Sequence, residues 1–129
     1  MKQAVMIVGS IYGGLSVILG ALGAHALKKV LSEVQLASFE VGVKYMMYHA
    51  IVLLLVGFVF NFETKLQRTM AWSFAIGTFL FSCSIYFLSL SDVLGMNFRF
   101  LGPVTPLGGL FMIVGWVLLL ISVMKKYAK

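Results

Sequence analysis

Two histidines are the side chains of this sequence best suited to binding a metal or a haem group. His25 and His49 are the only histidines, and both flank the first loop that the hydropathy pattern predicts. An imidazole pair can bind a transition metal or ligate haem axially. The alternative is structural, because His25 can end a helix by bonding free carbonyls and His49 can bond a neighbouring helix. The further ligands of a zinc site are missing nearby, which favours the structural interpretation and predicts no metal site.

Charged and phenolic side chains form a second candidate group near the same loop. Glu40, Lys44 and Tyr48 follow one another at four-residue steps, the spacing of neighbours on one helix face. Arg99 is the only basic residue of the third loop and can pair with acidic residues on its side. By helical phasing His49 points about 180° away from Glu40, so these two cannot share a site on one helix face. The group is either a polar network that ties the second helix to the third loop, or a ligand site.

Motifs that would indicate catalysis are absent. The chain has no GxxxxGK[ST], GxGxxG, CxxC or HExxH sequence. The middle of every predicted span also lacks Asp, Glu, Lys, Arg and His, whereas proton-coupled pumps usually place an ionisable group there. We therefore expect no enzyme activity and no cofactor.

The composition indicates a protein that lies in lipid. Of 129 residues, 61% are hydrophobic and 11% are charged, against about 45–50% and about 25% in a soluble domain. Such a chain has too little polar surface to cover a water-soluble fold. The formal net charge of +6 then predicts contact with anionic lipid headgroups, not with nucleic acid. The one cysteine, Cys83, lies in an apolar run and allows no intramolecular disulfide.

Four stretches are long and apolar enough to cross a bilayer. They cover about residues 4–24, 45–62, 69–91 and 107–124. The sequence therefore predicts an all-α integral membrane four-helix bundle, with residues 1–129 forming a single four-span domain. Ser32 and Gln35 have the spacing of a capping box, so one helix is expected from about Glu33 through Phe60. Its first part is predicted to be an amphipathic extension that precedes the second span.

The distribution of basic residues predicts the orientation. With four spans, both termini lie on one side of the membrane. That side holds Lys2, Lys65, Arg68, Lys125, Lys126 and Lys129, and the other side holds Lys28, Lys29, Lys44 and Arg99. The positive-inside rule places the richer side in the cytoplasm. We expect a multi-pass plasma-membrane protein with both termini in the cytoplasm.

Small residues recur along the first span. One stripe consists of Gly9, Gly13, Ser16, Gly20 and Gly23. A second set lies beside it and consists of Ser10, Gly14 and Ala21. In lipid, small residues let helix backbones approach closely, so the stripe is expected to be a packing surface. Because small residues cover much of the circumference, this span is expected to sit centrally in the bundle.

Three segments resemble a family of small membrane proteins known as domain of unknown function 423. They are GALGAHAL at residues 20–27, QLASFE at 35–40 continuing into VKYMMYHA at 43–50, and LGPVTPLGG at 101–109. The family is also grouped as uncharacterised protein family 0382 and is related to the animal transmembrane protein 256. The resemblance implies a multi-pass membrane protein, in bacteria one of the plasma membrane. It implies no mechanism and no catalytic residues.

Three functional hypotheses follow from the sequence. The first is a non-enzymatic structural or accessory membrane component, whose partners are membrane lipids and either a second copy of the chain or a larger membrane complex. The second is a small oligomeric transporter or channel. The third is haem or metal binding through His25 and His49. The uncharged span centres and the dense small-residue stripes favour the first.

Overall fold

Four long helices make up the fold. A computed structural model describes residues 1–128 of the chain. The helices are α1 (Lys2–Ala24), α2 (Glu33–Val59), α3 (Lys65–Leu94) and α4 (Val104–Tyr127), and two short 3₁₀ helices, η1 (Leu27–Lys29) and η2 (Arg99–Leu101), lie in the connections. Residues 1–128 contain no strand. All four helices are long and apolar enough to cross a membrane, which confirms the predicted all-α membrane bundle.

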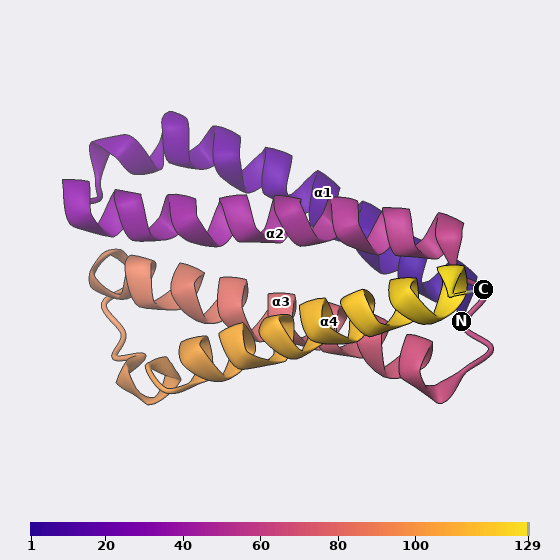
Figure 1. Cartoon of the computed structure of the whole chain (residues 1–129). Helices are drawn as coiled ribbons and strands as arrows, with labels where there is room; N and C mark the ends of the chain where they lie inside the picture. Colours follow the sequence, from indigo (N-terminus) through magenta and orange to yellow (C-terminus); the bar gives the residue numbers. More distant parts are fainter. Residues whose placement is uncertain (129) are drawn as a thin grey trace.

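The helices run back and forth and pack mainly on their neighbours in sequence. α1 packs on α2, α2 on α3, and α3 on α4, with only a minor contact between α1 and α3. Figure 1 shows two crossing layers, α1 with α2 above and α3 with α4 below. Both chain termini lie at the same end of the bundle (Figure 1), so both lie on one side of the membrane. The loops that carry η1 and η2 lie at the opposite end.

α2 begins at the predicted capping box. The Ser32 hydroxyl accepts a hydrogen bond from the Gln35 backbone N–H at 3.1 Å, and the Ser32 N–H donates to the Gln35 side-chain carbonyl at 3.0 Å. These reciprocal bonds satisfy free amides of the first turn. The helix then continues unbroken for 27 residues and ends at Val59, with Phe60 as its cap. At about 1.5 Å per residue it is about 40 Å long, more than a bilayer core of about 30 Å.

The closest helix approach lies between α3 and α4. A Cβ atom added at Gly77 would lie 2.8 Å from the Met112 backbone nitrogen and 2.9 Å from the Gly108 carbonyl oxygen. A Cβ added at Gly108 would overlap the Phe81 backbone nitrogen. Two backbones can touch in this way only where neither residue has a side chain. This pair of glycines therefore fixes how α3 and α4 cross.

The expectation that α1 sits centrally was wrong. Its stripe of small residues lies against α2, with Gly23 on Phe39 and Gly20 on Val43. The second set, Ser10, Gly14 and Ala21, is exposed, and a Cβ added at Gly14 would meet nothing within 4 Å. α1 is therefore an edge helix. Small residues permit close packing on every side where they occur, but only one side of α1 has a full-length neighbour.

One long-range hydrogen bond ties α1 to α3. The Tyr12 hydroxyl donates to the backbone carbonyl of Ala75 at 2.7 Å. Tyr12 is buried, so its phenol reaches across the bundle between α1 and α3. Helix carbonyls already accept one bond from their own helix and can accept a second. This bond holds the edge helix to the second layer.

Candidate functional site

His49 forms a polar bridge between α2 and α4. It is 4% exposed. Its Nδ1 lies 2.7 Å from the Tyr45 carbonyl oxygen, and the Trp116 indole N–H lies 3.2 Å from its Nε2. An indole N–H can only donate, so Nε2 must be an acceptor and Nδ1 carries the proton. Both nitrogens of a neutral His49 are therefore occupied by structural hydrogen bonds.

Aromatic rings surround His49. Its ring centroid lies 5.8 Å from that of Phe74 on α3, 6.0 Å from Trp116 on α4 and 6.2 Å from Tyr45 on its own helix. Phe74 and Trp116 also meet edge to face at 5.4 Å. A Cβ added at Gly115 would lie 2.8 Å from the Phe74 ring, so that glycine gives the ring its room. The imidazole is thus enclosed where three helices meet.

The sequence interpretation placed His49 too close to a span end. Ala50, the next residue, packs on Gly13 near the middle of α1. Trp116, which bonds His49, lies near the middle of α4. The expectation that every span centre lacks histidine was therefore wrong for α2. The cause is the start assigned to the second span. Lys44 was taken as its outer limit, although α2 begins earlier and already packs on α1 before Lys44.

The structure does not bring the two histidines together. His25 caps the C-terminus of α1, where its backbone N–H donates to the Ala21 carbonyl at 3.2 Å, and it is exposed. Gly23, two residues earlier, packs on Phe39. Phe39 precedes His49 by ten residues, about 15 Å along a helix. Within residues 1–128, no three His, Cys, Asp or Glu residues gather closely enough to hold a metal ion.

A hydrogen bond ties the start of α2 to the last turn of α3, and it uses residues outside the predicted network. The Gln35 side-chain amide donates to the Asp92 carboxylate at 2.6 Å. Arg99 is the first residue of η2 and is exposed, and its backbone N–H donates to the Asn97 side-chain carbonyl at 2.9 Å. Glu40 is also exposed. Gln35, which also forms the capping box, thus joins the start of α2 to the end of α3.

Glu40, Lys44 and Tyr48 share the outer face of α2. All three are exposed, whereas Gly42 and His49 on the other side of the helix are buried. This arrangement agrees with the phasing argument that separates Glu40 from His49. The candidate residues therefore divide into two groups, one inside the bundle and one on its outer surface.

The packing residues of α1 differ in how closely they are approached. A Cβ added at Gly9 would lie 3.1 Å from both the Ala50 carbonyl oxygen and the Leu53 Cβ, whereas one at Gly13 would be 3.8 Å from the Ala50 Cβ. The Ser16 hydroxyl donates to the Tyr12 carbonyl at 2.7 Å. Gly9 is therefore the most closely approached glycine of the α1 stripe.

Hydroxyl groups of α3 were not singled out for bonding from the sequence, yet they join the helices. The Ser82 hydroxyl donates to the Gly42 carbonyl of α2 at 2.8 Å. The hydroxyls of Ser84 and Thr105 share a hydrogen bond of 2.6 Å between α3 and α4. Serine recurs along α3, and in lipid such side chains commonly bond across helices. The recurrence of serine along α3 was the feature of the sequence that could have predicted these bonds.

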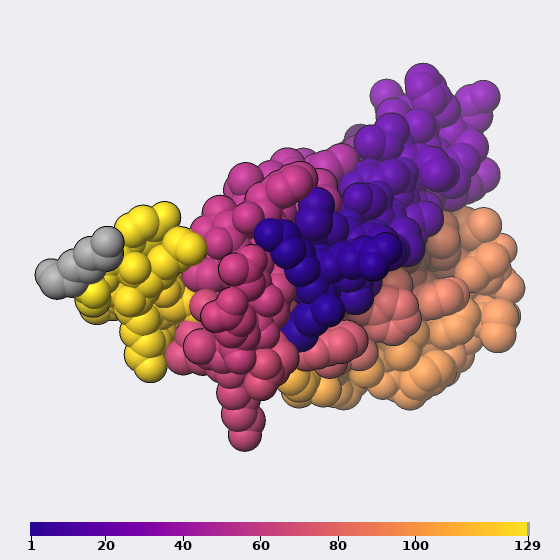
Figure 2. Space-filling view, turned by 90° about the vertical axis from the view of Figure 1, so that its right-hand side faces the viewer, coloured from indigo at the N-terminus to yellow at the C-terminus, as the bar shows by residue number. Residues whose placement is uncertain are grey.

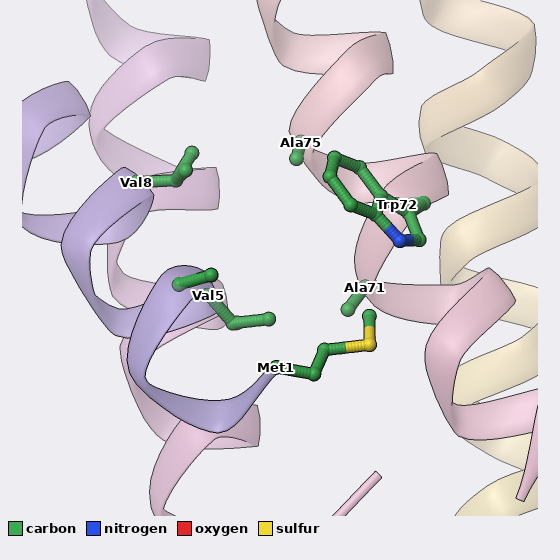
Figure 3. Close-up of a pocket in the computed structure, with 7 residues that line it drawn as sticks. Met1, Val5, Val8, Ala71, Trp72 and Ala75 are labelled. Carbon is green, nitrogen blue, oxygen red and sulfur yellow. The ribbon is translucent and has the colours of Figure 1, made fainter.

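A small cavity lies between α1 and α3 at the end with the termini. Figure 3 shows Met1, the residue before α1, and Val5 of α1 facing Ala71 and Trp72 of α3 across it. Its volume is about 30 Å³. The side chains around it are apolar, so it offers no partner to a polar ligand or to water. It is a packing gap between the two layers.

Four apolar helices joined by short loops, with structural hydrogen bonds inside, define a small multi-pass membrane protein. The chain belongs to the protein family of unknown function DUF423, whose sequence profile matches residues 19–109. It is 36% identical to the UPF0382 membrane protein SH2409 of Staphylococcus haemolyticus over 93% of this chain and 94% of the relative. It is also 35% identical to the UPF0382 membrane protein YwdK of Bacillus subtilis, over 93% of this chain and 95% of the relative.

One relative carries the name of an inner membrane protein. The UPF0382 inner membrane protein YgdD of Escherichia coli K12 is 33% identical over 99% of this chain and 95% of its own length. No solved structure matches the chain. The relatives thus confirm the resemblance seen in the sequence and the location in a membrane.

Proposed function

We propose that this chain is a non-enzymatic accessory component of the plasma membrane, which packs against another membrane-embedded protein surface through the outer face of α2. The observation that carries the proposal is the position of Glu40 and Lys44. Both are exposed in the single chain. A charged side chain that faces lipid is unfavourable, and such residues commonly find a protein partner.

The depth of these two charges follows from their neighbours. Gly42, between them, packs on Ile85 and Tyr86 of α3, and Val43 packs on Gly20 of α1. Ile85 lies seven residues, about two helical turns, before Asp92, the first charged residue beyond it. Lys44 therefore lies beside the apolar part of α1, about one turn inside its end. Glu40 follows Phe39, which packs on Gly23 in the last turn of α1.

The surface around the two charges is suited to protein contact. Val41, Tyr45, Tyr48 and Ile51 are exposed on the same side of α2. The interhelix hydrogen bonds of α2 come instead from other residues, namely Gln35, Gly42, Met46, His49 and Val59. Tyrosine, present here as Tyr45 and Tyr48, is enriched in protein interfaces. We call this surface the outer α2 face; its residues are Glu40, Val41, Lys44, Tyr45, Tyr48 and Ile51.

The buried polar groups support the non-enzymatic part of the proposal. His49, the one buried histidine of residues 1–128, has both nitrogens engaged in holding α2 to α4. A general base or a metal ligand needs a nitrogen lone pair that is free to act. The Tyr12 and Ser82 hydroxyls likewise donate to backbone carbonyls of other helices. These groups stabilise the bundle.

Neutralising the outer α2 face should release the chain from its complex. The double variant Glu40→Gln with Lys44→Met should migrate as a single chain after gentle extraction, because both charges of the outer α2 face are lost. The control, Lys28→Gln with Glu33→Gln, changes the same charges at exposed positions outside that face and should migrate like the wild type. Native gel electrophoresis measures both. Identical migration of the two double variants would contradict the proposal.

The orientation with both termini in the cytoplasm is supported by the charge at the two ends of the bundle. The terminal end carries Lys2, Lys65, Arg68, Lys125 and Lys126 against one acid, Glu63. A green fluorescent protein fused after Lys129 should therefore fluoresce, and alkaline phosphatase fused there should be inactive. An active phosphatase fusion would show that the termini lie outside the cytoplasm and would contradict this orientation.

A further inference from the structure

A hollow opens at the terminal end of the bundle, between the start of α3 and the end of α4. Its volume is about 250 Å³, and its lining residues are Thr64, Leu66, Gln67, Ser122, Lys125 and Lys126. Figure 2 looks onto this end and shows the yellow C-terminal segment beside the magenta segment that joins α2 to α3. The hollow lies outside the outer α2 face, so it requires a separate explanation.

Two residues that line the hollow each have a buried polar atom without a partner. The Ser122 hydroxyl is buried and unpaired in a residue that is 3% exposed, and the side-chain carbonyl oxygen of Gln67 is also buried and unpaired. A serine inside a helix can bond the carbonyl four residues back. Ser122 instead keeps its hydroxyl free beside the hollow. Such groups are unfavourable unless a ligand or an ordered water completes them.

The charge around the hollow is positive. Lys125 and Lys126 close the last turn of α4. The Lys126 ammonium donates to the Val59 carbonyl at 3.2 Å and lies 5.5 Å from the Phe60 ring centroid, which uses one of its three donors. The guanidinium of Arg68 is occupied by the Phe62 and Glu63 carbonyls. The two lysines therefore retain donors for an anion.

The hollow lies at the depth of lipid headgroups. No charged residue occurs between Arg99 and Lys125, so Lys125 marks where α4 leaves the hydrocarbon. Ser122 lies about one turn further in. A phosphate at the two lysines would thus sit at the membrane surface, with the rest of its headgroup beside Ser122 and Gln67. Each lysine near the membrane surface adds attraction for anionic headgroups.

We propose that this hollow binds the headgroup of phosphatidylglycerol. The phosphodiester accepts hydrogen bonds from Lys125 and Lys126. A glycerol hydroxyl donates to the free Gln67 carbonyl oxygen, and the Ser122 hydroxyl bonds the same headgroup. Phosphatidylcholine fits less well, because its trimethylammonium group has no donor for Gln67 and is repelled by the lysines. The glycerol hydroxyls are the feature that the two unpaired atoms select.

Native mass spectrometry of the purified full chain tests this site by titration with phosphatidylglycerol, with phosphatidylcholine and with inorganic phosphate. The wild type should retain one phosphatidylglycerol at about tenfold or more higher affinity than phosphatidylcholine. Ser122→Ala removes only one hydroxyl and should weaken phosphatidylglycerol alone, by about threefold to tenfold. Lys125→Gln with Lys126→Gln should remove the preference. The matched control, Lys28→Gln with Lys29→Gln, should keep it.

The thermal midpoint of each variant, measured without phosphatidylglycerol, separates loss of the site from loss of the fold. Variants that keep the wild-type midpoint but lose the stabilisation that phosphatidylglycerol gives the wild type support the site. Equal retention of the two lipids by the wild type would overturn the proposal. Equal losses in the two lysine double variants would overturn it as well. Competition by inorganic phosphate at matched concentration would identify a free-anion site and not a lipid site.

Discussion

Gly108→Ala should destabilise the folded bundle by about 3 kcal/mol or more, the upper range for overpacking a core. The added methyl group would overlap the Phe81 backbone nitrogen and lie 2.8 Å from the Gly77 carbonyl oxygen. Both contacts are backbone atoms of α3, so no side-chain rotation relieves them. The two helices would have to separate along their full contact. Unfolding by SDS titration in mixed micelles measures the change.

Gly14→Ala is the matched control for this variant. It is also a glycine within a membrane helix, but its added Cβ would meet nothing within 4 Å. Alanine has a higher helix propensity than glycine by about 1 kcal/mol. The control should therefore be neutral or slightly stabilising. Equal destabilisation by both substitutions would mean that α3 and α4 do not pack through Gly108.

His49→Ala should produce the second large loss, about 2–4 kcal/mol of unfolding free energy, as for other large-to-small core changes. The variant removes a ring enclosed by Phe74 and Trp116 and leaves the Trp116 indole N–H without its partner. A hydrogen bond across membrane helices contributes about 0.6–1.7 kcal/mol of this. The same SDS titration gives the value.

Two further variants separate packing from hydrogen bonding at His49. Trp116→Phe keeps an aromatic ring but removes the donor, so it should cost about 1 kcal/mol. Tyr48→Ala changes the neighbouring residue, which is 53% exposed, and should leave the stability of the isolated chain nearly unchanged. If His49→Ala were as mild as Tyr48→Ala, the imidazole would not be a bridge between helices.

The long elements could be predicted from the sequence because local signals determine them. Uninterrupted apolar stretches gave the four helices, and Ser32 with Gln35 gave the start of α2. The capping box acts between residues three apart, so no knowledge of the fold is needed. The family followed from three short segments, and the sequence profile and the relatives confirm it.

The relations between helices could not be predicted in the same way. A bond such as that of Trp116 with His49, or of Tyr12 with Ala75, joins residues more than sixty positions apart. Which side of α1 finds a neighbour depends on how α2 packs between α1 and α3, which no residue of α1 encodes. The depth of His49 was missed for a related reason. The charge of Lys44 was taken to mark the start of the second span. Only the packing of α2 on the neighbouring helices shows that α2 lies against apolar residues before Lys44.

Native mass spectrometry of the wild-type chain, extracted gently from its own membrane, tests the central claim most directly. If the chain is an accessory component held through Glu40 and Lys44, it should leave the membrane in an assembly of defined mass that contains more than this one chain. The Glu40→Gln with Lys44→Met variant should leave as one chain. A wild-type protein that is already a single chain under these conditions would contradict the claim.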